Sequence, residues 1–367
     1  MDGVYSDDQA RDHVVDDGAP AGITVFVVGG TGESYPGDVR TEVVGLLSAV
    51  TDELDERFDS RWVAYPASYG PAPHPGGMSF ADSVAIGARR LSGLLERTAG
   101  PVALLGYSQG AVVIRAALAG LWTRGDPVVT RLLGVGLVAD PHQPPGAAPG
   151  CDGWGVAGPG AELPPGLPVM WVGAPDDVIC NARADSLVRD FADLTRAMTF
   201  AALGRWGCNA WEVLRRNAFQ NARRTAVRPS QWRRDVHRLA SAWWEIRCYL
   251  PSMMRILGIV LTNSPGGRHT SYQYEPYRRG SVTDPASTGC QVIAGWLQVQ
   301  ATFAGEVPAA SPAPSGPHEE PIRRRGPVTV SVTGPRRSRM RGRGQSPWYW
   351  PPTVLRTTIG VPRGTLS

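Results

Sequence analysis

Residues 101–121, PVALLGYSQGAVVIRAALAGL, restrict the possible fold more than any other part of the chain. An unbroken apolar run, VALL, leads into the pentapeptide GYSQG, and small and apolar residues with helical spacing follow it. This order is typical of a buried strand, a tight turn and a helix. Because parallel strands need a crossover connection, usually a helix, the segment predicts an α/β fold with a parallel sheet.

Other apolar runs indicate the remaining strands of this sheet. Two stretches between these runs have the spacing of helices: residues 39–57 and Phe80–Leu95. Ser79 is a candidate N-cap for the second of these helices. The predicted strands are ITVFVV from Ile23, RWVAYPAS at 61–68, RLLGVGLVAD at 131–140 and LPVMWVGAPDDVIC at 167–180. We expect a doubly wound, mainly parallel sheet, with its active site beyond the carboxyl ends of the strands.

Composition divides the chain into five segments. Residues 1–20 are an acidic arm, and residues 21–183 contain the first part of the α/β core. Between 184 and 262 the strand pattern gives way to an Arg- and Trp-rich helical pattern, which predicts a helical insert over the active site. Residues 263–304 complete the core. Residues 305–367 are rich in Pro and Arg, a composition typical of disordered extensions.

The basic character of the chain belongs to this tail alone. The net charge is +4, but the residues from Pro321 onward contain ten Arg and no acid, which leaves residues 1–320 at −6. The tail therefore has three open interpretations: it binds an anionic wall polymer, it binds nucleic acid, or it is simply disordered. We expect that no nucleic acid is required for function.

Several classes of protein are disfavoured. No run of about eighteen apolar residues is present, so no membrane span is predicted. The acidic N-terminus is unlike a secretory signal. Five widely spaced cysteines without a CxxC pair indicate neither a zinc site nor a disulfide scaffold, although Cys151 and Cys180 are candidates for one disulfide. We expect a monomer that uses no metal and no cofactor.

The pentapeptide Gly106–Gly110 fits the pattern GxSxG of a nucleophile elbow, in which a strained turn lifts a serine hydroxyl above the sheet. The plain β–α turn is the alternative interpretation. The strand-like run before Ser108 and the helical pattern after it supply the context that the motif needs. A serine hydroxyl is a weak nucleophile until an imidazole, oriented by a carboxylate, takes its proton.

The acid and the histidine are expected to follow the serine in that order. Asp176 and Asp177 come directly after a predicted strand, and we favour Asp177, although one of the two could instead cap a helix. His269 lies in a glycine-preceded loop, SPGGRHTSY, and is the preferred base. His237 lies in an Arg-rich helical pattern and His318 in the tail, so both are weaker candidates.

The tetrahedral intermediate also needs two backbone N–H donors for its oxyanion. Gln109 is expected to supply one, because it follows the nucleophile directly. The second is expected from the loop after the first strand, GGTGE, where Thr31 is favoured and its neighbour Gly30 is the alternative. A phosphate-binding turn is disfavoured for this loop, since it lacks GxGxxG and a following Lys-Thr pair.

Seven motifs together resemble a known family: GGTGE, YPASYGP, SFADSV, GYSQG, ADPHQPPG, GAPDDVIC and HTSY. Their order and spacing over roughly residues 22–300 are similar to those of cutinase-like serine esterases of the α/β-hydrolase fold. The closest resemblance is to the lysin B enzymes of phages that infect mycolate-bearing actinobacteria. Two features depart from the pattern: Gly173 stands where cutinases place the cysteine that pairs with Cys180, and the Arg-rich tail is foreign to it.

The resemblance implies a mycolylarabinogalactan esterase, which hydrolyses the ester between mycolic acids and arabinogalactan at the end of infection. It implies Ser108 as nucleophile, Asp177 as acid and His269 as base, and it likens residues 184–262 to the linker subdomain of lysin B. Such an enzyme is made in the infected host's cytoplasm without a signal peptide. It then acts at the cell envelope once lysis begins, in peripheral contact with the outer lipid layer.

Two alternatives to this function stand beside it. One is a bacterial cutinase-like lipase or acyltransferase. The other is a non-catalytic wall- or lipid-binding module in which the basic tail serves as an anchor.

Overall fold

The computed structural model describes residues 22–199, 202–216, 218–220, 231–256, 259–278 and 280–306. The predicted acidic arm and nearly all of the predicted Pro/Arg-rich tail lie outside these ranges. The described residues belong to one compact unit. No helix among them is long and apolar enough to span a bilayer.

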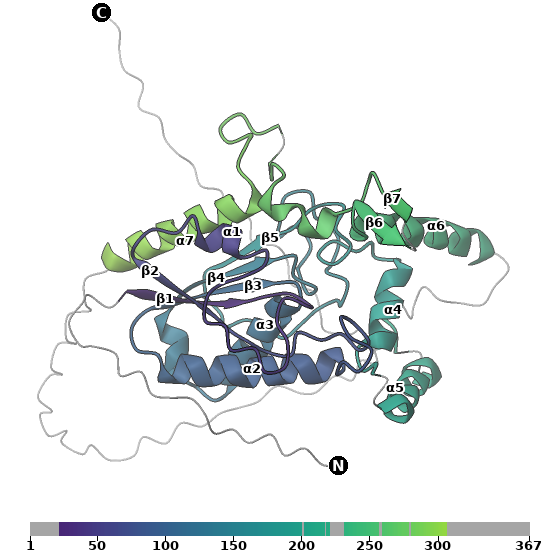
Figure 1. Cartoon of the computed structure of the whole chain (residues 1–367), viewed down its shortest axis with the longest axis horizontal. Coiled ribbons are helices and arrows are strands. Elements are labelled where there is room, and N and C mark those ends of the chain that lie inside the picture. The colour runs from purple at the N-terminus through teal and green to yellow at the C-terminus, as the bar shows by residue number, and fades with distance from the viewer. Residues whose placement is uncertain are drawn as a thin grey trace, which may run out of the picture. The chain divides into compact units, whose positions relative to one another are not determined.

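A five-stranded parallel sheet forms the centre of the protein (Figure 1). Its strands have the spatial order β2-β1-β3-β4-β5, so one strand is added on one side of β1 and the next three on its other side. The strands are β1 (Ile23–Val28), β2 (Phe58–Trp62), β3 (Val102–Tyr107), β4 (Leu132–Val138) and β5 (Val169–Val172). The doubly wound, mainly parallel α/β architecture predicted from the sequence is confirmed.

Helices cover both faces of the sheet, because the inner strands are apolar on both sides. Helices α2 (Phe80–Arg97) and α3 (Gln109–Thr123) pack on one face, where Leu104 of β3 lies in a buried apolar cluster. Helices α1 (Ser48–Thr51) and α7 (Gly289–Glu306) pack on the other, where the adjacent Leu105 contributes. Figure 1 shows α7 and α2 on opposite sides of the sheet.

The α2 helix begins where the sequence predicts. The Ser79 side chain accepts a hydrogen bond from the Asp82 amide and caps the helix, and the apolar residues of α2 face the sheet. The helix predicted over 39–57 is wrong, because only the short α1 forms within it. Gly45 precedes α1 with a φ of +74°, a left-handed conformation that an α-helix cannot continue through.

The predicted strand at 61–68 is displaced toward the N-terminus. Strand β2 ends at Trp62, and the Val63 amide still donates to the Val27 carbonyl oxygen of β1 at 2.9 Å. Residues 64–68 pass outside the ladder, with Ala67 at a φ of +47°. Because β2 is an edge strand, only one side of it is held by hydrogen bonds to β1. Its apolar run extends past the ladder because the residues after Trp62 are buried by other parts of the core.

The described residues of 184–262, called the insert segment below, form three helices: α4 (Leu187–Thr195), α5 (Leu203–Arg216) and α6 (Gln231–Tyr249). The helical pattern expected for this segment does not extend to its end. There, β6 (Met253–Ile256) and β7 (Ile259–Thr262) pair as an antiparallel hairpin. Pro251 follows α6 and cannot continue a helix, and the β-branched residues of β7 favour a strand.

Candidate active site

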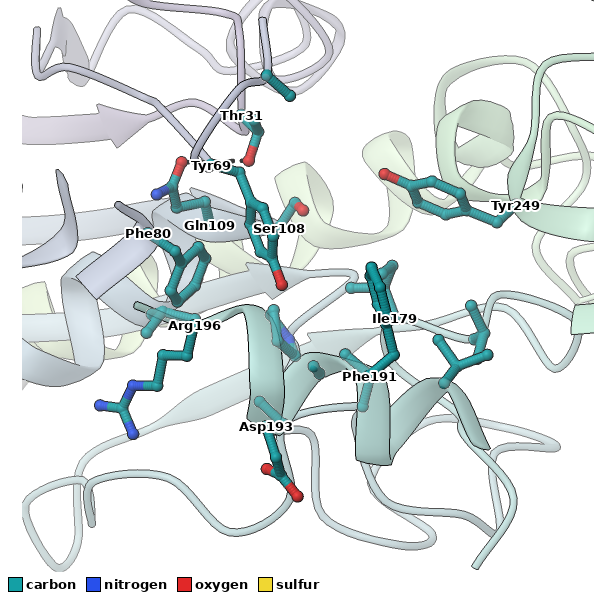
Figure 2. A pocket seen from close by; sticks show the side chains of 18 of the residues that line it. Thr31, Tyr69, Phe80, Ser108, Gln109, Ile179, Phe191, Asp193, Arg196 and Tyr249 are labelled. Atoms are coloured by element: carbon teal, nitrogen blue, oxygen red, sulfur yellow. Dashed lines mark hydrogen bonds between the residues drawn. The ribbon is translucent and has the colours of Figure 1, made fainter. Parts of the chain in front are cut away.

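Ser108 stands on a tight turn between β3 and α3. Its backbone has φ 52° and ψ −116°, a strained conformation for a residue with a Cβ. A Cβ at Gly110 would lie 2.0 Å from the carbonyl oxygen of Val28, and one at Gly106 would lie 2.9 Å from Ala111 Cα. Glycine is therefore required on both sides of a turn that places Ser108 against a cavity (Figure 2).

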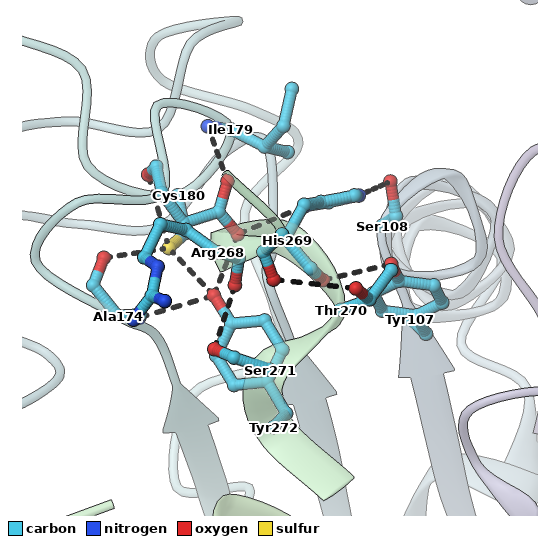
Figure 3. Close-up of polar contacts among 12 residues, drawn as sticks. Tyr107, Ser108, Ala174, Ile179, Cys180, Arg268, His269, Thr270, Ser271 and Tyr272 are labelled. Atoms are coloured by element: carbon cyan, nitrogen blue, oxygen red, sulfur yellow. Dashed lines mark hydrogen bonds and ion pairs between the residues drawn. The ribbon is translucent and has the colours of Figure 1, made fainter. Parts of the chain in front are cut away.

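A hydrogen-bonded chain joins Ser108, His269 and Asp177 (Figure 3). The His269 Nε2 atom lies 3.0 Å from Ser108 Oγ, and its Nδ1 atom lies 2.9 Å from Asp177 Oδ2. All three side chains are buried. The structure thus brings together three residues that are far apart in the sequence, in the arrangement that a serine nucleophile, a base and an orienting acid require.

Asp177, and not Asp176, contacts the imidazole. Asp176 is exposed to solvent, whereas Asp177 is completely buried in the loop after β5. The Asp177 Oδ1 atom accepts a hydrogen bond from the Ile179 amide at 3.0 Å. The sequence could not separate the two neighbours on chain position alone, because only the tertiary fold determines which one points inward.

Tyr272 is a third partner of Asp177 that the sequence reasoning missed. Its hydroxyl donates to Asp177 Oδ2 at 2.6 Å and accepts from the Ala174 amide at 3.1 Å. Burial raises the pKa of Asp177, but the nearby His269 and the hydrogen bonds from His269, Tyr272 and Ile179 outweigh it, so the pKa is lowered. The carboxylate is therefore held ionised inside the protein.

The backbone and ring of His269 are held in place from several sides. Gly267, with a φ of +81°, starts the 3₁₀ helix η4 (Arg268–Gln273) that carries the histidine. The Tyr107 hydroxyl donates to the His269 carbonyl oxygen at 2.9 Å. The rings of Tyr107 and Tyr249 have centroids 5.1 and 5.2 Å from that of the imidazole. Tyr249 comes from α6, so the insert segment contacts the candidate base directly.

The two expected oxyanion donors lie beside the serine. Thr31 and Gln109 line the same cavity as Ser108, and the Thr31 hydroxyl donates to Gln109 Oε1 at 3.1 Å. The Gln109 side-chain amide in turn donates to the Ser68 carbonyl oxygen at 3.0 Å. The Gly30 amide donates to Glu33 Oε2 at 2.6 Å, so its N–H group is already engaged. Thr31 is therefore the better candidate in this loop.

The cavity in front of Ser108 has a volume of about 820 Å³ (Figure 2). It is large enough for a sizeable organic ligand. Its wall is mainly apolar and comes from α2 and α3, from loops that follow the strands, and from α4 and α6 of the insert segment. The apolar residues of the wall include Phe80, Val84, Val112, Val156, Val178, Ile179, Leu187, Val188, Phe191, Leu239, Ile246 and Leu250.

His142 also lines this cavity but is held away from the role of base. Its Nδ1 atom lies 2.8 Å from the Gly158 carbonyl oxygen. Burial lowers the pKa of His142, which favours the neutral ring. Among the described residues, no group of three or more His, Cys, Asp or Glu side chains is placed to hold a metal ion.

Cys151 and Cys180 are neighbouring buried thiols and do not form a disulfide. Burial raises the pKa of the Cys180 thiol, which lies 3.4 Å from the Tyr272 hydroxyl oxygen. A Cβ at Gly173 would lie 3.0 Å from Cys180 Sγ. Gly173 thus occupies a place from which a cysteine could reach Cys180, and it offers no sulfur there.

Residues 57–151 match the PE-PPE domain, a lipase-like domain of the α/β-hydrolase type. The match includes the turn at Ser108 and ends before Asp177 and His269. No curated protein matches the sequence.

Three solved structures illustrate the similarity to known hydrolases. A cutinase-like protein from Cryptococcus sp. is 20% identical, with a TM-score of 0.32, over 44% of this chain and 79% of its own. The RedJ thioesterase of Streptomyces coelicolor is 18% identical, with a TM-score of 0.24, over 36% of this chain and 47% of its own. A pyrethroid hydrolase from Sphingobium faniae is 21% identical, with a TM-score of 0.21, over 35% of this chain and 44% of its own. This chain therefore spans less than half of the latter two.

Proposed function

We propose that this protein is a serine carboxylic ester hydrolase that acts on esters of a large apolar acyl group. The observation that carries the proposal is the chain from Ser108 Oγ through the His269 imidazole to Asp177, placed beside an apolar cavity of about 820 Å³. The hydrogen-bonded series of three residues supplies an activated nucleophile, and the cavity supplies a binding site for hydrocarbon.

In the proposed reaction, Ser108 Oγ attacks the ester carbonyl carbon while His269 Nε2 takes the hydroxyl proton. Asp177 fixes the orientation of the imidazole and stabilises its charged form. The backbone amides of Gln109 and Thr31 donate to the developing oxyanion. The imidazolium returns its proton to the leaving alcohol, and the acyl group stays on Ser108. Water, activated by the same imidazole, then releases the carboxylic acid.

The finer proposal is that the acyl group is a mycolic acid esterified to arabinogalactan. The resemblance of the motif set to lysin B supports it, and so does an apolar cavity bounded by the insert segment. On this proposal the protein is a phage enzyme that is released onto the cell envelope during lysis, and its partner is the outer lipid layer. The mechanism uses no cofactor.

The test starts with a medium-chain p-nitrophenyl ester and the full-length protein. Ser108→Ala is expected to lower the rate of p-nitrophenol release about 10⁴-fold or more, because the nucleophile is gone. Ser48→Ala in α1 is the matched control and should keep the wild-type rate. An unchanged rate in Ser108→Ala would refute the proposed nucleophile and favour a non-catalytic binding module.

The substrate is tested on isolated mycolylated cell wall. Free mycolic acids, detected by mass spectrometry after incubation with the wild type and absent with Ser108→Ala, are the expected products. Release of shorter fatty acids alone would contradict the mycolate proposal while leaving the esterase intact.

A bacterial cutinase-like lipase or acyltransferase is the second candidate, and the match of residues 57–151 to the lipase-like PE-PPE domain supports the lipase activity. An acyltransferase passes the acyl group from Ser108 to an alcohol in place of water. Incubation with the ester and an added sugar alcohol separates the two functions. A hydrolase yields mainly free acid, and a transferase yields mainly the new ester.

A further inference from the structure

Helix α6 buries charged side chains on the face that packs against the rest of the protein. Arg238 is buried, and its guanidinium lies 2.7 Å from Asp190 Oδ2 and donates to the Asp185 carbonyl oxygen at 2.7 Å. Glu245 is buried and accepts a hydrogen bond from the Ser186 hydroxyl. These contacts set the rotation of α6 about its axis, because breaking them would leave buried charges without partners.

With this rotation, the apolar side chains of α6 face outward. Val236, Leu239, Trp243 and Ile246 recur at intervals of three and four residues and thus form one stripe along the helix. All four are exposed, and Trp243 keeps 65% of its surface accessible. A helix of a globular protein usually shows the reverse arrangement, with its apolar stripe inside. Within the described part of the chain this stripe therefore remains exposed, although Leu239 and Ile246 also line the cavity in front of Ser108.

The β6–β7 hairpin continues this apolar surface. The chain enters β6 directly after α6 (Figure 1), and the Asn263 side chain donates to the carbonyl oxygens of Arg247, Leu250 and Pro251. These bonds tie the base of the hairpin to the end of the helix. Arg255 is the single charged residue of the hairpin, which spans residues 253–262.

Both faces of the hairpin expose apolar side chains. Neighbouring residues of a strand point to opposite faces, and cross-strand partners share a face. Ile259 and Leu261 therefore lie on one face and are 63% and 44% exposed. Val260 and Met253 lie on the other face, together with Arg255 and Thr262, and are 50% and 66% exposed. A two-stranded hairpin that is bare on both faces is at best marginally stable in water. An apolar surrounding would stabilise both faces at once.

We infer that α6 and the hairpin form a docking surface for the hydrocarbon of a lipid layer. We call this surface the apolar rim and define it as Val236, Leu239, Trp243, Ile246, Met253, Ile259, Val260 and Leu261. A protein partner would cover one face of a protruding hairpin, whereas hydrocarbon surrounds both. Trp243 suits such a boundary, because its indole combines a large apolar body with one polar N–H group.

The apolar rim is continuous with the cavity in front of Ser108. Leu239 and Ile246 belong to both, since they are exposed on α6 and also line the cavity. A lipid held at the rim therefore has an apolar path along α6 toward Ser108. On the proposed function, this places lipid esters of the layer next to the serine, and that step alone rests on the esterase proposal.

The test measures co-flotation of the full-length protein with phosphatidylcholine vesicles. These vesicles are zwitterionic, so the Arg-rich C-terminal residues contribute little to binding. The variant Trp243→Ser/Ile259→Ser/Leu261→Ser removes rim side chains that do not line the cavity. We expect at least a tenfold loss of vesicle affinity, with unchanged hydrolysis of a soluble short-chain ester. Hydrolysis of an ester embedded in the vesicles should fall at least tenfold.

Two controls make the result specific. The variant Trp122→Ser/Val282→Ser/Val299→Ser removes exposed apolar side chains elsewhere and should float like the wild type. Ser108→Ala should also float like the wild type, so failure of the esterase proposal leaves the docking result readable.

Three outcomes would overturn the docking surface. They are a wild type that does not float, a rim variant that floats undiminished, and a wild-type dimer that the rim variant converts to a monomer. The dimer result would assign the rim to a second copy of this chain.

Discussion

The Asp177 carboxylate sits in a completely buried site with three donors directed at it: His269 Nδ1, the Tyr272 hydroxyl and the Ile179 amide. An isolated carboxylate would be protonated in such a place, because burial disfavours charge. The donors reverse that preference and lower the pKa of Asp177. At the scale of single residues, the charge of Asp177 therefore depends in part on the Tyr272 hydroxyl and the Ile179 amide, which take no direct part in the proposed reaction.

Exchange of the two neighbouring acids tests which of them orients the imidazole. Asp177→Asn is expected to lower kcat about 10³- to 10⁴-fold, because an amide favours the wrong imidazole tautomer. Asp176→Asn is the matched control and should stay within about twofold of the wild type, since Asp176 is exposed. Steady-state hydrolysis of a p-nitrophenyl ester measures both. Comparable losses in the two variants would contradict the assignment.

Tyr272→Phe tests the role of Tyr272 as a positioning residue. The hydrogen bond from Tyr272 holds the carboxylate oxygen that contacts His269, and a hydrogen bond to a charged group contributes about 1.5–3 kcal/mol. Without it Asp177 orients the imidazole less well, so kcat/KM is expected to fall about tenfold or more. Without this donor the Asp177 carboxylate has a higher pKa and stabilises the imidazolium more strongly. The acid limb of the pH profile of kcat/KM should therefore move to higher pH. Tyr274→Phe, at an exposed neighbour, is the control, and an unmoved acid limb would leave Tyr272 a purely structural role.

At the scale of elements, strand β3 and helix α3 are joined by a turn so tight that the first turn of α3 lies against the backbone of β1. Gly110 lies in the first turn of α3, and a Cβ there would meet the Val28 carbonyl oxygen of β1. The main chain cannot yield as a flexible side chain would. The elbow is therefore held by the sheet on which it stands, which keeps Ser108 in its strained conformation.

Two Gly→Ala exchanges within α3 separate this steric requirement from helix propensity. Gly110→Ala is expected to lower the free energy of unfolding by about 1–3 kcal/mol and to reduce activity, because α3 must move away from β1. A Cβ at Gly120 would contact only Arg124 Nη1, at 3.6 Å. Gly120→Ala should therefore stabilise the protein by about 0.5–1 kcal/mol. Urea unfolding measures both. Equal effects of the two exchanges would be inconsistent with the close approach to Val28.

At the scale of the whole molecule, buried carboxylates link stability to pH. Asp38 accepts hydrogen bonds from Ser34, Arg40 and Trp62, and the Arg40 guanidinium in particular holds its pKa well below the usual range. The pKa of Asp177 is lowered as well. Both groups stabilise the folded state above the unfolded pKa of about 3.9, and this contribution is lost as the pH falls through their folded values.

We therefore expect the free energy of unfolding to decrease as the pH falls below about 4. Asp38→Asn should lower the free energy of unfolding by about 1–3 kcal/mol at pH 7. In this variant the free energy of unfolding should also decrease less steeply between pH 4 and pH 2, since one carboxylate with a lowered pKa is gone. Asp59→Asn, in a surface pair with Arg61, should change stability by less than about 1 kcal/mol. Urea unfolding followed by tryptophan fluorescence measures this. An unchanged acid slope in Asp38→Asn would contradict the linkage.

Local pattern was sufficient for much of this architecture. The inner strands are continuous apolar runs because both faces of the sheet are covered, and such runs can be recognised without knowing their neighbours. The Ser79 cap of α2 acts within a few residues of chain, and the glycine pattern around Ser108 can be recognised locally, although the structure ties Gly110 to its contact with Val28. The order of the elbow, the acidic pair and the glycine-preceded histidine could likewise be predicted, since these features are local in the sequence.

Contacts between distant parts of the chain decided the rest. Asp176 and Asp177 have the same side chain, and burial against Tyr272 distinguishes them. Gly30 and Thr31 differ as donors because Glu33 takes only the Gly30 amide. The outward stripe of α6 has an ordinary helical spacing in the sequence. Its direction depends on the Arg238–Asp190 ion pair and the Ser186–Glu245 hydrogen bond, which no spacing reveals. Periodicity defines which residues share a face, and only packing defines where that face points.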